Sequence, residues 1–254
     1  WQFLRAARAS RVAIAVPALH DLALLSRRGY EAFTLLWPQG VPLTEHGLLI
    51  LCRSTHALRE EHDDAKMARR LGMPVEILDR DAATALEPDL DMAIAGAVRY
   101  PLDAHVIPQR VVATLVAGLA EAGVELRWHT EVVGFRRAES RVAKAVTTTG
   151  EIGGDEFVIA AGMWSAALAR TIDLPLPLMS GKGYSFTLAK PRVRPHACAL
   201  LAEARIAVTP MGSSLRFAGT MELCGLDRSI DQRRVAAMID AIPRYYPQFG
   251  PAEF

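Results

Sequence analysis

The residues with the clearest chemical meaning form one short segment in the middle of the chain, 157–165. An apolar run there leads into Ala160, Ala161 and Gly162, and Ser165 follows near the expected start of a helix. Small residues at the end of a strand allow another group to approach the backbone closely, and N–H groups at a helix start favour an anion. A phosphate-bearing cofactor would fit this combination, and tight strand–helix packing would explain it equally well. The residues alone leave both interpretations open.

Other signatures of chemistry are absent from the sequence. It contains no GxGxxG after a strand, no GxxxxGK[ST], no HExxH and no G-x-S-x-G. A complete autonomous dinucleotide fold is therefore not supported. The seven histidines are scattered, and Cys52 and Cys224 lie in apolar, strand-like settings typical of small core residues. We expect no metal site and no catalytic acid–base pair.

Composition excludes several classes of function. The 254 residues carry 29 Lys+Arg and 28 Asp+Glu, and a net charge of +1 argues against nucleic acid as the main partner. A hydrophobic fraction of 51% excludes wholesale disorder. Three cysteines with no CxxC pair exclude a disulfide scaffold and indicate a reducing, cytoplasmic compartment. The apolar stretch 12–25 contains Pro17 and is too short for a bilayer, which takes ~20 residues, so no transmembrane segment is expected.

Periodicity predicts the elements that must position these residues. Residues 1–36 read as two helices. A helix capped by Ser54 or Thr55 should end at Gly72, and Pro108 should begin an amphipathic helix closed by Gly123. Asp79 should cap a short helix, and Asp231 should cap the final one. The predicted strands are 47–52, 74–78, 95–100, 124–129, 132–137, 142–149, 156–161, 183–188, 206–211 and 215–220.

Several short stretches, taken in order along the chain, carry a family resemblance: 1–5, 46–50, 86–88, 96–105, 129–132, 160–165, 182–185 and 217–222. They resemble the D-amino acid oxidase superfamily of FAD-dependent oxidoreductases, in particular the bacterial D-amino acid dehydrogenases. Each match is short, and the order and spacing across nearly the whole chain carry the resemblance. Members open with a strand and GxGxxG, and close with a Gly-Leu-Arg-Pro segment whose arginine pairs with the substrate carboxylate. The resemblance thus implies a central fragment, truncated at both ends.

The resemblance implies an α+β fold with an α/β FAD-binding remnant that contains a β-meander. A substrate domain with a mixed, largely antiparallel sheet and helices should accompany it. The expected parts are N-terminal helices at 1–36, substrate domain at 37–102 and 175–254, and FAD-binding domain at 103–174.

Site residues follow by position in the resembling motifs. The residues implied to contact the cofactor FAD are Val132, Ala160, Ala161, Gly162, Trp164, Lys182 and Gly183. Those implied to line the substrate pocket are Tyr184, Met221 and His105, and for His105 a loop or helix-capping role stays open. No catalytic residue is expected within the chain, because the carboxylate-binding arginine should lie beyond its C-terminus. Arg99 or Arg216 could take its place, and spacing singles out neither.

The implied activity is oxidative deamination of a small-molecule amino acid by hydride transfer from Cα to the flavin. The imino acid formed would hydrolyse to a keto acid and ammonia, and the protein would mainly supply orientation. Two alternatives stay open: a glycine- or sarcosine-type oxidase, and a non-catalytic binding or interface module that has lost flavin. A homodimer, and a peripheral contact with the inner membrane or an electron acceptor, stay open as partners.

Overall fold

The computed structural model describes residues 8–250 and divides the chain into two compact units. The larger, here called the sheet unit, comprises the residues up to 118, 183–220 and those from 230 onward. The smaller, here called the meander unit, comprises residues 119–182 together with a strap, residues 221–229. The division therefore falls after residue 118, inside a helix, and places the strap in the smaller unit.

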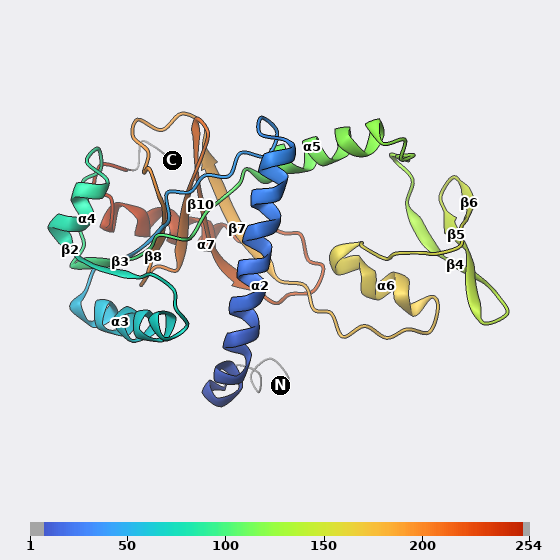
Figure 1. Cartoon of the computed structure of the whole chain (residues 1–254), viewed down its shortest axis with the longest axis horizontal. Helices are drawn as coiled ribbons and strands as arrows, with labels where there is room; N and C mark the ends of the chain where they lie inside the picture. Colours follow the sequence, from blue (N-terminus) through green and yellow to red (C-terminus); the bar gives the residue numbers. More distant parts are fainter. Residues whose placement is uncertain (1–7, 251–254) are drawn as a thin grey trace. The chain divides into compact units, whose positions relative to one another are not determined.

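A seven-stranded mixed sheet forms the centre of the sheet unit (Figure 1). Its strand order is β2-β3-β1-β8-β9-β10-β7. β1 pairs in parallel with β8, with Leu48 opposite Cys198, whereas the β1–β3, β2–β3, β8–β9 and β9–β10 pairs are antiparallel. The sheet is thus mixed and largely antiparallel, as predicted. The strands are β1 (Leu48–Cys52), β2 (Glu76–Asp79), β3 (Gly96–Tyr100), β7 (Lys182–Leu188), β8 (Cys198–Leu201), β9 (Ile206–Met211) and β10 (Ser214–Glu222).

One face of this sheet carries the main hydrophobic core. Val208 and Phe217 lie opposite each other on β9 and β10, and both are fully buried. Met238 from α7 (Gln232–Ala241) and Tyr245 belong to the same buried cluster. Each such side chain contributes roughly 1.5–3 kcal/mol through burial. This face therefore anchors the C-terminal helix to the sheet.

The opposite face is covered in part. At β1 and β3, Ile50 and Val98 pack with Ala57 and Ala65 of α3 (Thr55–Arg70). Farther along, the same face at β9 and β10 presents residues that are only half-buried: Ala207, Thr209, Arg216 and Ala218. The sheet thus keeps an accessible surface beside its buried one, and we call the region of β7, β9 and β10 on this side the open face.

Local signals placed most helices correctly. The Ser54 hydroxyl accepts the Ala57 N–H at the start of α3, and Gly72 follows its end with φ +81°. Asp79 and Asp231 cap their helices through their carboxylates. Of the two helices expected in 1–36, the described part contains one, Ala9–Leu36, which continues through Pro17 although proline cannot donate a backbone hydrogen bond; the rest of that prediction lies outside the described residues. The other helices are α2 (Ala9–Leu36), α4 (Arg80–Leu86) and α5 (Pro108–Glu121).

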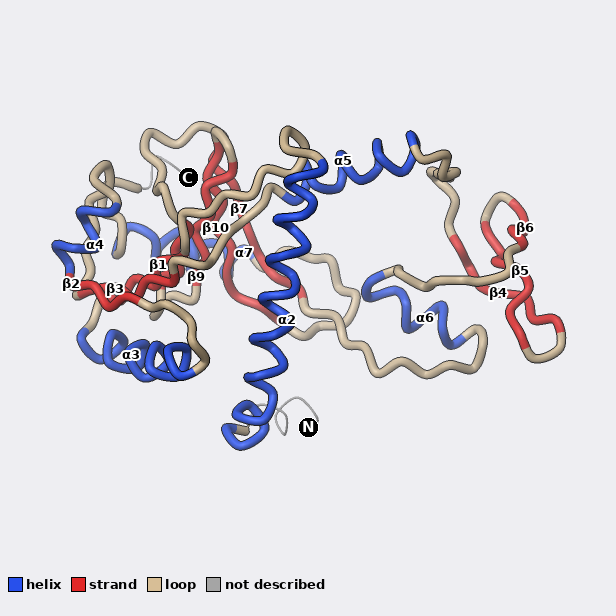
Figure 2. Tube along the Cα trace, viewed as in Figure 1, coloured by secondary structure: helices blue, strands red, loops and turns tan. Residues whose placement is uncertain are grey.

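The meander unit contains the three-stranded sheet β4-β5-β6 (Figure 2). Its elements are β4 (Val132–Ala138), β5 (Arg141–Thr147), β6 (Gly150–Gly153), a 3-10 turn (Gly162–Trp164) and α6 (Ser165–Arg170). The strands predicted at 124–129 and 156–161 are absent, because neither segment finds a partner among the described strands; Val158 is 90% exposed. The third strand instead follows a tight turn after Thr147. No helix within residues 8–250 is both long and apolar enough to cross a membrane.

Candidate functional site

The small-residue segment of the meander unit is accessible from solvent. Gly162 has φ +53°, and a Cβ added there would meet no atom within 4 Å. Trp164 is 54% exposed, and Ala160 is exposed as well. The backbone here can thus be approached closely by a flat or phosphate-bearing group. These residues fit the FAD contact that the resemblance implies.

The expected helix dipole at this segment is weaker than the sequence suggested. A 3-10 turn precedes α6, and α6 has only six residues. Because so short a helix aligns few peptide dipoles, its N-terminus attracts an anion only weakly. The support for a cofactor contact here is the open space beside Gly162. Val132 is the first residue of β4 and is half-buried. Val132 and Gly162 therefore lie in the same unit, which is consistent with contacts to one cofactor.

Lys182 fastens the strap. Its ammonium lies 2.6 Å from Glu222 Oε1, donates to the Ser229 carbonyl at 2.9 Å and contacts Asp227 at 3.3 Å. The hydrogen bonds from Ser229 and Lys182 lower the pKa of Asp227 to about 2. Met221, on this strap, is 63% exposed. Lys182 thus has a clear positioning role for the strap, and its cofactor contact and the pocket role of Met221 remain predictions.

On β7 of the sheet unit, alternate residues face opposite ways. Gly183 and Ser185 are exposed, whereas Tyr184 is 6% exposed and belongs to the main core. The Tyr184 hydroxyl accepts the Asp231 N–H at 3.3 Å, at the start of α7. The sequence motif does not reveal this alternation. Here the Tyr184 side chain points away from the open face, and only its backbone is available there.

The structure distinguishes Arg99 from Arg216 as candidates for binding a carboxylate, which their spacing in the sequence does not. Arg99 on β3 pairs with Glu76, directly opposite on β2, with Nη1 3.0 Å from Oε2. Arg216 on β10 is half-buried on the open face and donates from Nη2 to the Ser185 hydroxyl at 3.2 Å. Within residues 8–250 it forms no ion pair with a carboxylate. A guanidinium in this setting retains capacity for an incoming anion.

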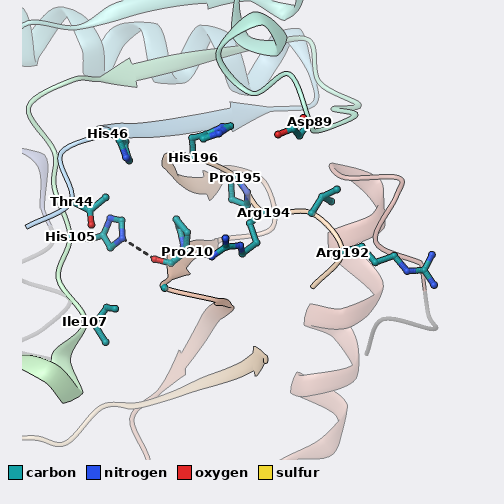
Figure 3. Close-up of a pocket in the computed structure, with 12 residues that line it drawn as sticks. Thr44, His46, Asp89, His105, Ile107, Arg192, Arg194, Pro195, His196 and Pro210 are labelled. Atoms are coloured by element: carbon teal, nitrogen blue, oxygen red, sulfur yellow. Dashed lines mark hydrogen bonds between the residues drawn. The ribbon is translucent and has the colours of Figure 1, made fainter. Parts of the chain in front are cut away.

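His105 lines a cavity of about 670 Å³ in the sheet unit (Figure 3). Its Nε2 lies 2.8 Å from the Pro210 carbonyl and its Nδ1 3.1 Å from Cys198 Sγ. Burial lowers the pKa of His105 and, with the nearby Asp103 charge, raises the pKa of Cys198 to about 11, although a hydrogen bond to Thr209 opposes that rise. A neutral imidazole that donates to Pro210 and accepts from the thiol satisfies both contacts. His105 therefore forms a fixed wall.

Sequence reasoning missed the rest of this cavity, because its lining comes from five segments that are far apart in the sequence. They are brought together by the Thr44–His105 bridge, by the start of β8 and by the β9–β10 turn. Across residues 8–250, no group of three or more His, Cys, Asp or Glu side chains is placed to hold a metal ion. The lining residues are Thr44, His46, Asp89, His105, Ile107, Arg192, Val193, Arg194, Pro195, His196, Pro210 and Gly212.

The fold is similar to that of glycine oxidase and several other enzymes of solved structure. Glycine oxidase from Bacillus cereus superposes with a TM-score of 0.81 at 21% identity, over 91% of this chain and 64% of that one. At this identity the likeness shows the fold alone. Residues 4–254 match the family described as FAD dependent oxidoreductase, and the chain belongs to that family.

Relatives in sequence carry more specific names. D-amino acid dehydrogenase 2 from Mesorhizobium japonicum is 31% identical over 236 residues, which is 90% of this chain and 56% of the relative. D-amino acid dehydrogenase from Vibrio atlanticus is 29% identical over 211 residues, 81% of this chain and 51% of the relative. The chain thus spans about half the length of the curated relatives it matches.

Proposed function

We propose that this chain is part of an FAD-dependent enzyme that oxidises the amine-bearing carbon of a small amino acid, with D-amino acids as the first candidates. Membership of the FAD dependent oxidoreductase family supports the cofactor. The names of the similar relatives support the substrate class. The geometry of the site suggests which residues of this chain would bind the cofactor and which would bind the substrate.

The cofactor-binding role falls to exposed backbone with small side chains. FAD, when bound, supplies the acceptor for the hydride that leaves Cα. In the meander unit, the residues proposed to hold it are Val132, Ala160, Ala161, Gly162, Trp164 and Lys182, and in the sheet unit Gly183. The open space beside Gly162 supports this assignment.

The observation that carries the substrate proposal is the setting of Arg216. It is half-buried on the open face, it contacts Ser185, and its guanidinium pairs with no carboxylate in the described chain. A planar guanidinium binds a carboxylate through two parallel, charge-assisted hydrogen bonds. We infer that Arg216 binds the carboxylate of the amino acid and thereby orients Cα. Ser185 would hold the guanidinium in position.

Flavin absorbance tests the proposal directly. The purified protein, supplemented with FAD, should show bound flavin bands that bleach under anaerobic conditions when a D-amino acid is added. The L-enantiomer serves as the matched control, and glycine and sarcosine as separate arms for the oxidase alternative. A protein that binds no FAD, or whose flavin no amino acid reduces, would instead favour the non-catalytic module.

Reoxidation then identifies the electron acceptor. Oxygen and a soluble quinone analogue, added to the reduced protein in parallel, should differ in the rate at which the flavin bands return. Faster return with the quinone supports a dehydrogenase, and faster return with oxygen supports an oxidase. The homodimer and the peripheral membrane contact stay predictions, open to measurement of mass in solution and to vesicle sedimentation.

A further inference from the structure

Within the sheet unit, the cavity beside His105 lies at the far ends of the strands from Gly183. It is lined where β1 and β8 begin and where β9 turns into β10, at Pro210 and Gly212. Gly183 and Thr220 mark the opposite ends of β7 and β10, where a Cβ on Gly183 would lie 3.9 Å from the Thr220 carbonyl. The described lining of the cavity includes none of Gly183, Ser185 and Arg216, the residues of the sheet unit that the proposed oxidation uses.

One wall of the cavity is an extended segment with alternating character. Arg192, Arg194 and His196 are exposed, whereas Val193 and Pro195 between them are half-buried and buried. In an extended chain, side chains at every second position share one side. Arg194 and His196, both in the lining of the cavity, are thus presented on the exposed side of this segment.

A buried carboxylate fixes this segment. Glu87 is 2% exposed and accepts the backbone N–H groups of His196 and Ala197 at 2.7 and 2.8 Å. Its Oε2 also lies 3.2 Å from His196 Nδ1. An imidazole that donates from Nδ1 to Glu87 directs its other nitrogen away from the carboxylate. The positions of His196 and of its neighbours along the segment are consequently set before any ligand arrives.

The charges around the cavity favour an anion. Arg194 supplies a guanidinium group, His46 and His196 supply imidazoles, and Asp89 is the one carboxylate among the lining residues that the structure describes. Figure 3 shows the Arg194 side chain extending toward Pro210, with the His46 and His196 rings along one side. Arg194 has no ion pair within the described chain. A volume of about 670 Å³ falls in the range of small-molecule sites.

We propose that this cavity binds a small oxyanion with two or more negative charges, of the phosphate or polycarboxylate class, through Arg194, His46 and His196. Arg194 forms two charge-assisted hydrogen bonds to one anionic group, while the imidazoles contact the other oxygens. His105, with both ring nitrogens already bonded, closes the base of the site and takes no part in binding. The site is a second one, additional to the carboxylate contact at Arg216.

Calorimetric titration with inorganic phosphate and with citrate, at constant ionic strength set by chloride, tests the proposal. Saturable binding of at least one of them is expected, with about tenfold weaker affinity in Arg194→Gln, the loss of one charged contact. Arg59→Gln is the matched control, because Arg59 is an exposed arginine on α3 outside the lining. Absence of saturable binding, or equal weakening in both variants, would overturn the site.

A second measurement does not depend on any variant folding. Crystals of the protein soaked in tungstate should show an anomalous peak next to Arg194 and His46, and a peak elsewhere alone would count against the site. Both measurements are made on protein with or without flavin. Loss of the anion site and loss of FAD binding are therefore distinguishable. The titration measures anion binding, and the absorbance spectrum of the same sample measures bound flavin.

Discussion

The Tyr245 hydroxyl donates to Glu203 Oε2 at 2.6 Å, across 42 residues of sequence, and accepts the backbone N–H groups of Glu203 and Ala204 at 3.0 and 3.2 Å. The Glu203 carboxylate also accepts the N–H groups of Arg53 and Ser54. One buried phenol and one carboxylate thus join the β8–β9 turn, the start of α3 and the C-terminal segment.

Tyr245→Phe should destabilise the protein without changing its fold. The variant keeps the buried ring and leaves two backbone N–H groups and a carboxylate without the hydroxyl, a loss of about 1–2 kcal/mol. Urea denaturation followed by circular dichroism measures it. Tyr30→Phe on α2 is a suitable control, since no hydrogen bond from its hydroxyl is present within the described residues. Equal midpoints for the two variants would contradict the expectation.

The acid stability of the protein should depend on Glu203. Burial raises the pKa of Glu203, but the hydrogen bonds from Tyr245, Arg53 and Ser54 outweigh it and lower the pKa to about 2. A carboxyl with a folded pKa below its unfolded value stabilises the fold above the unfolded pKa and loses this contribution as pH falls toward the folded pKa. Wild type should therefore exceed Glu203→Gln in stability near neutral pH by ~1 kcal/mol, limited by solvent exposure. The gap should close between about pH 5 and about pH 2, and a gap independent of pH would rule the mechanism out.

Arg216→Gln should raise KM for the amino acid about 10-fold to 100-fold, because a charge-assisted pair with the carboxylate is lost. Arg216→Lys should recover part of this through its charge, without the planar fork. Arg99→Gln is the control, since Arg99 already pairs with Glu76, and its KM should match wild type. Steady-state kinetics, with flavin content measured beside them, decide between these outcomes.

Thiol chemistry should distinguish the three cysteines. Burial, with smaller contributions from Glu61 and Glu203, raises the pKa of Cys52 to about 12, and the pKa of Cys198 rises to about 11. Both therefore stay protonated and slow to alkylate at about pH 8. Cys224 on the strap is half-buried, and we expect one equivalent of iodoacetamide in the folded protein and three in urea. Cys224→Ser should abolish labelling of the folded protein. Rapid labelling of the folded variant would contradict the assignment of the reactive thiol to Cys224.

Gly162→Val should weaken FAD binding about tenfold or more, because the new side chain fills the open approach beside the backbone. The left-handed φ adds about 1–2 kcal/mol of strain. Gly123→Val is a matched control, since Gly123 also has a positive φ and open space around it, in the same unit but outside the cofactor segment. Flavin titration should show the loss only at Gly162, although both variants lower the unfolding midpoint.

Local chemistry made much of the fold predictable. The cap at Ser54, the glycine after α3 and the proline at the start of α5 each act within a few residues of the helix end that they define. β8 escaped prediction because it has four residues and gains its stability from partners far away in sequence. Segment 156–161 has the composition of a strand, but composition cannot supply a partner for its backbone.

The candidate site was predictable to a smaller extent. The small-residue segment was found from its own sequence, whereas the roles of Arg99 and Arg216 depend on strand register, which places Glu76 opposite one and Thr209 opposite the other. The cavity beside His105 forms only where five segments of the chain come together. Contacts between distant segments depend on the topology of the fold, and the periodicity of the sequence does not predict them.

The parallel pairing of β1 with β8 has a consequence for synthesis of the chain. Leu48 of β1 can pair with β8 only after Cys198 has been synthesised. At ribosomal rates of about 5–20 residues per second, the interval between the two residues is roughly 8 to 30 s. Throughout this time, β1 forms an apolar, unpaired edge of the incomplete sheet β2-β3-β1. An unpaired edge of this kind is a site for aggregation. Expression of the protein should therefore respond to chaperone supply during translation more than to the stability of the finished fold.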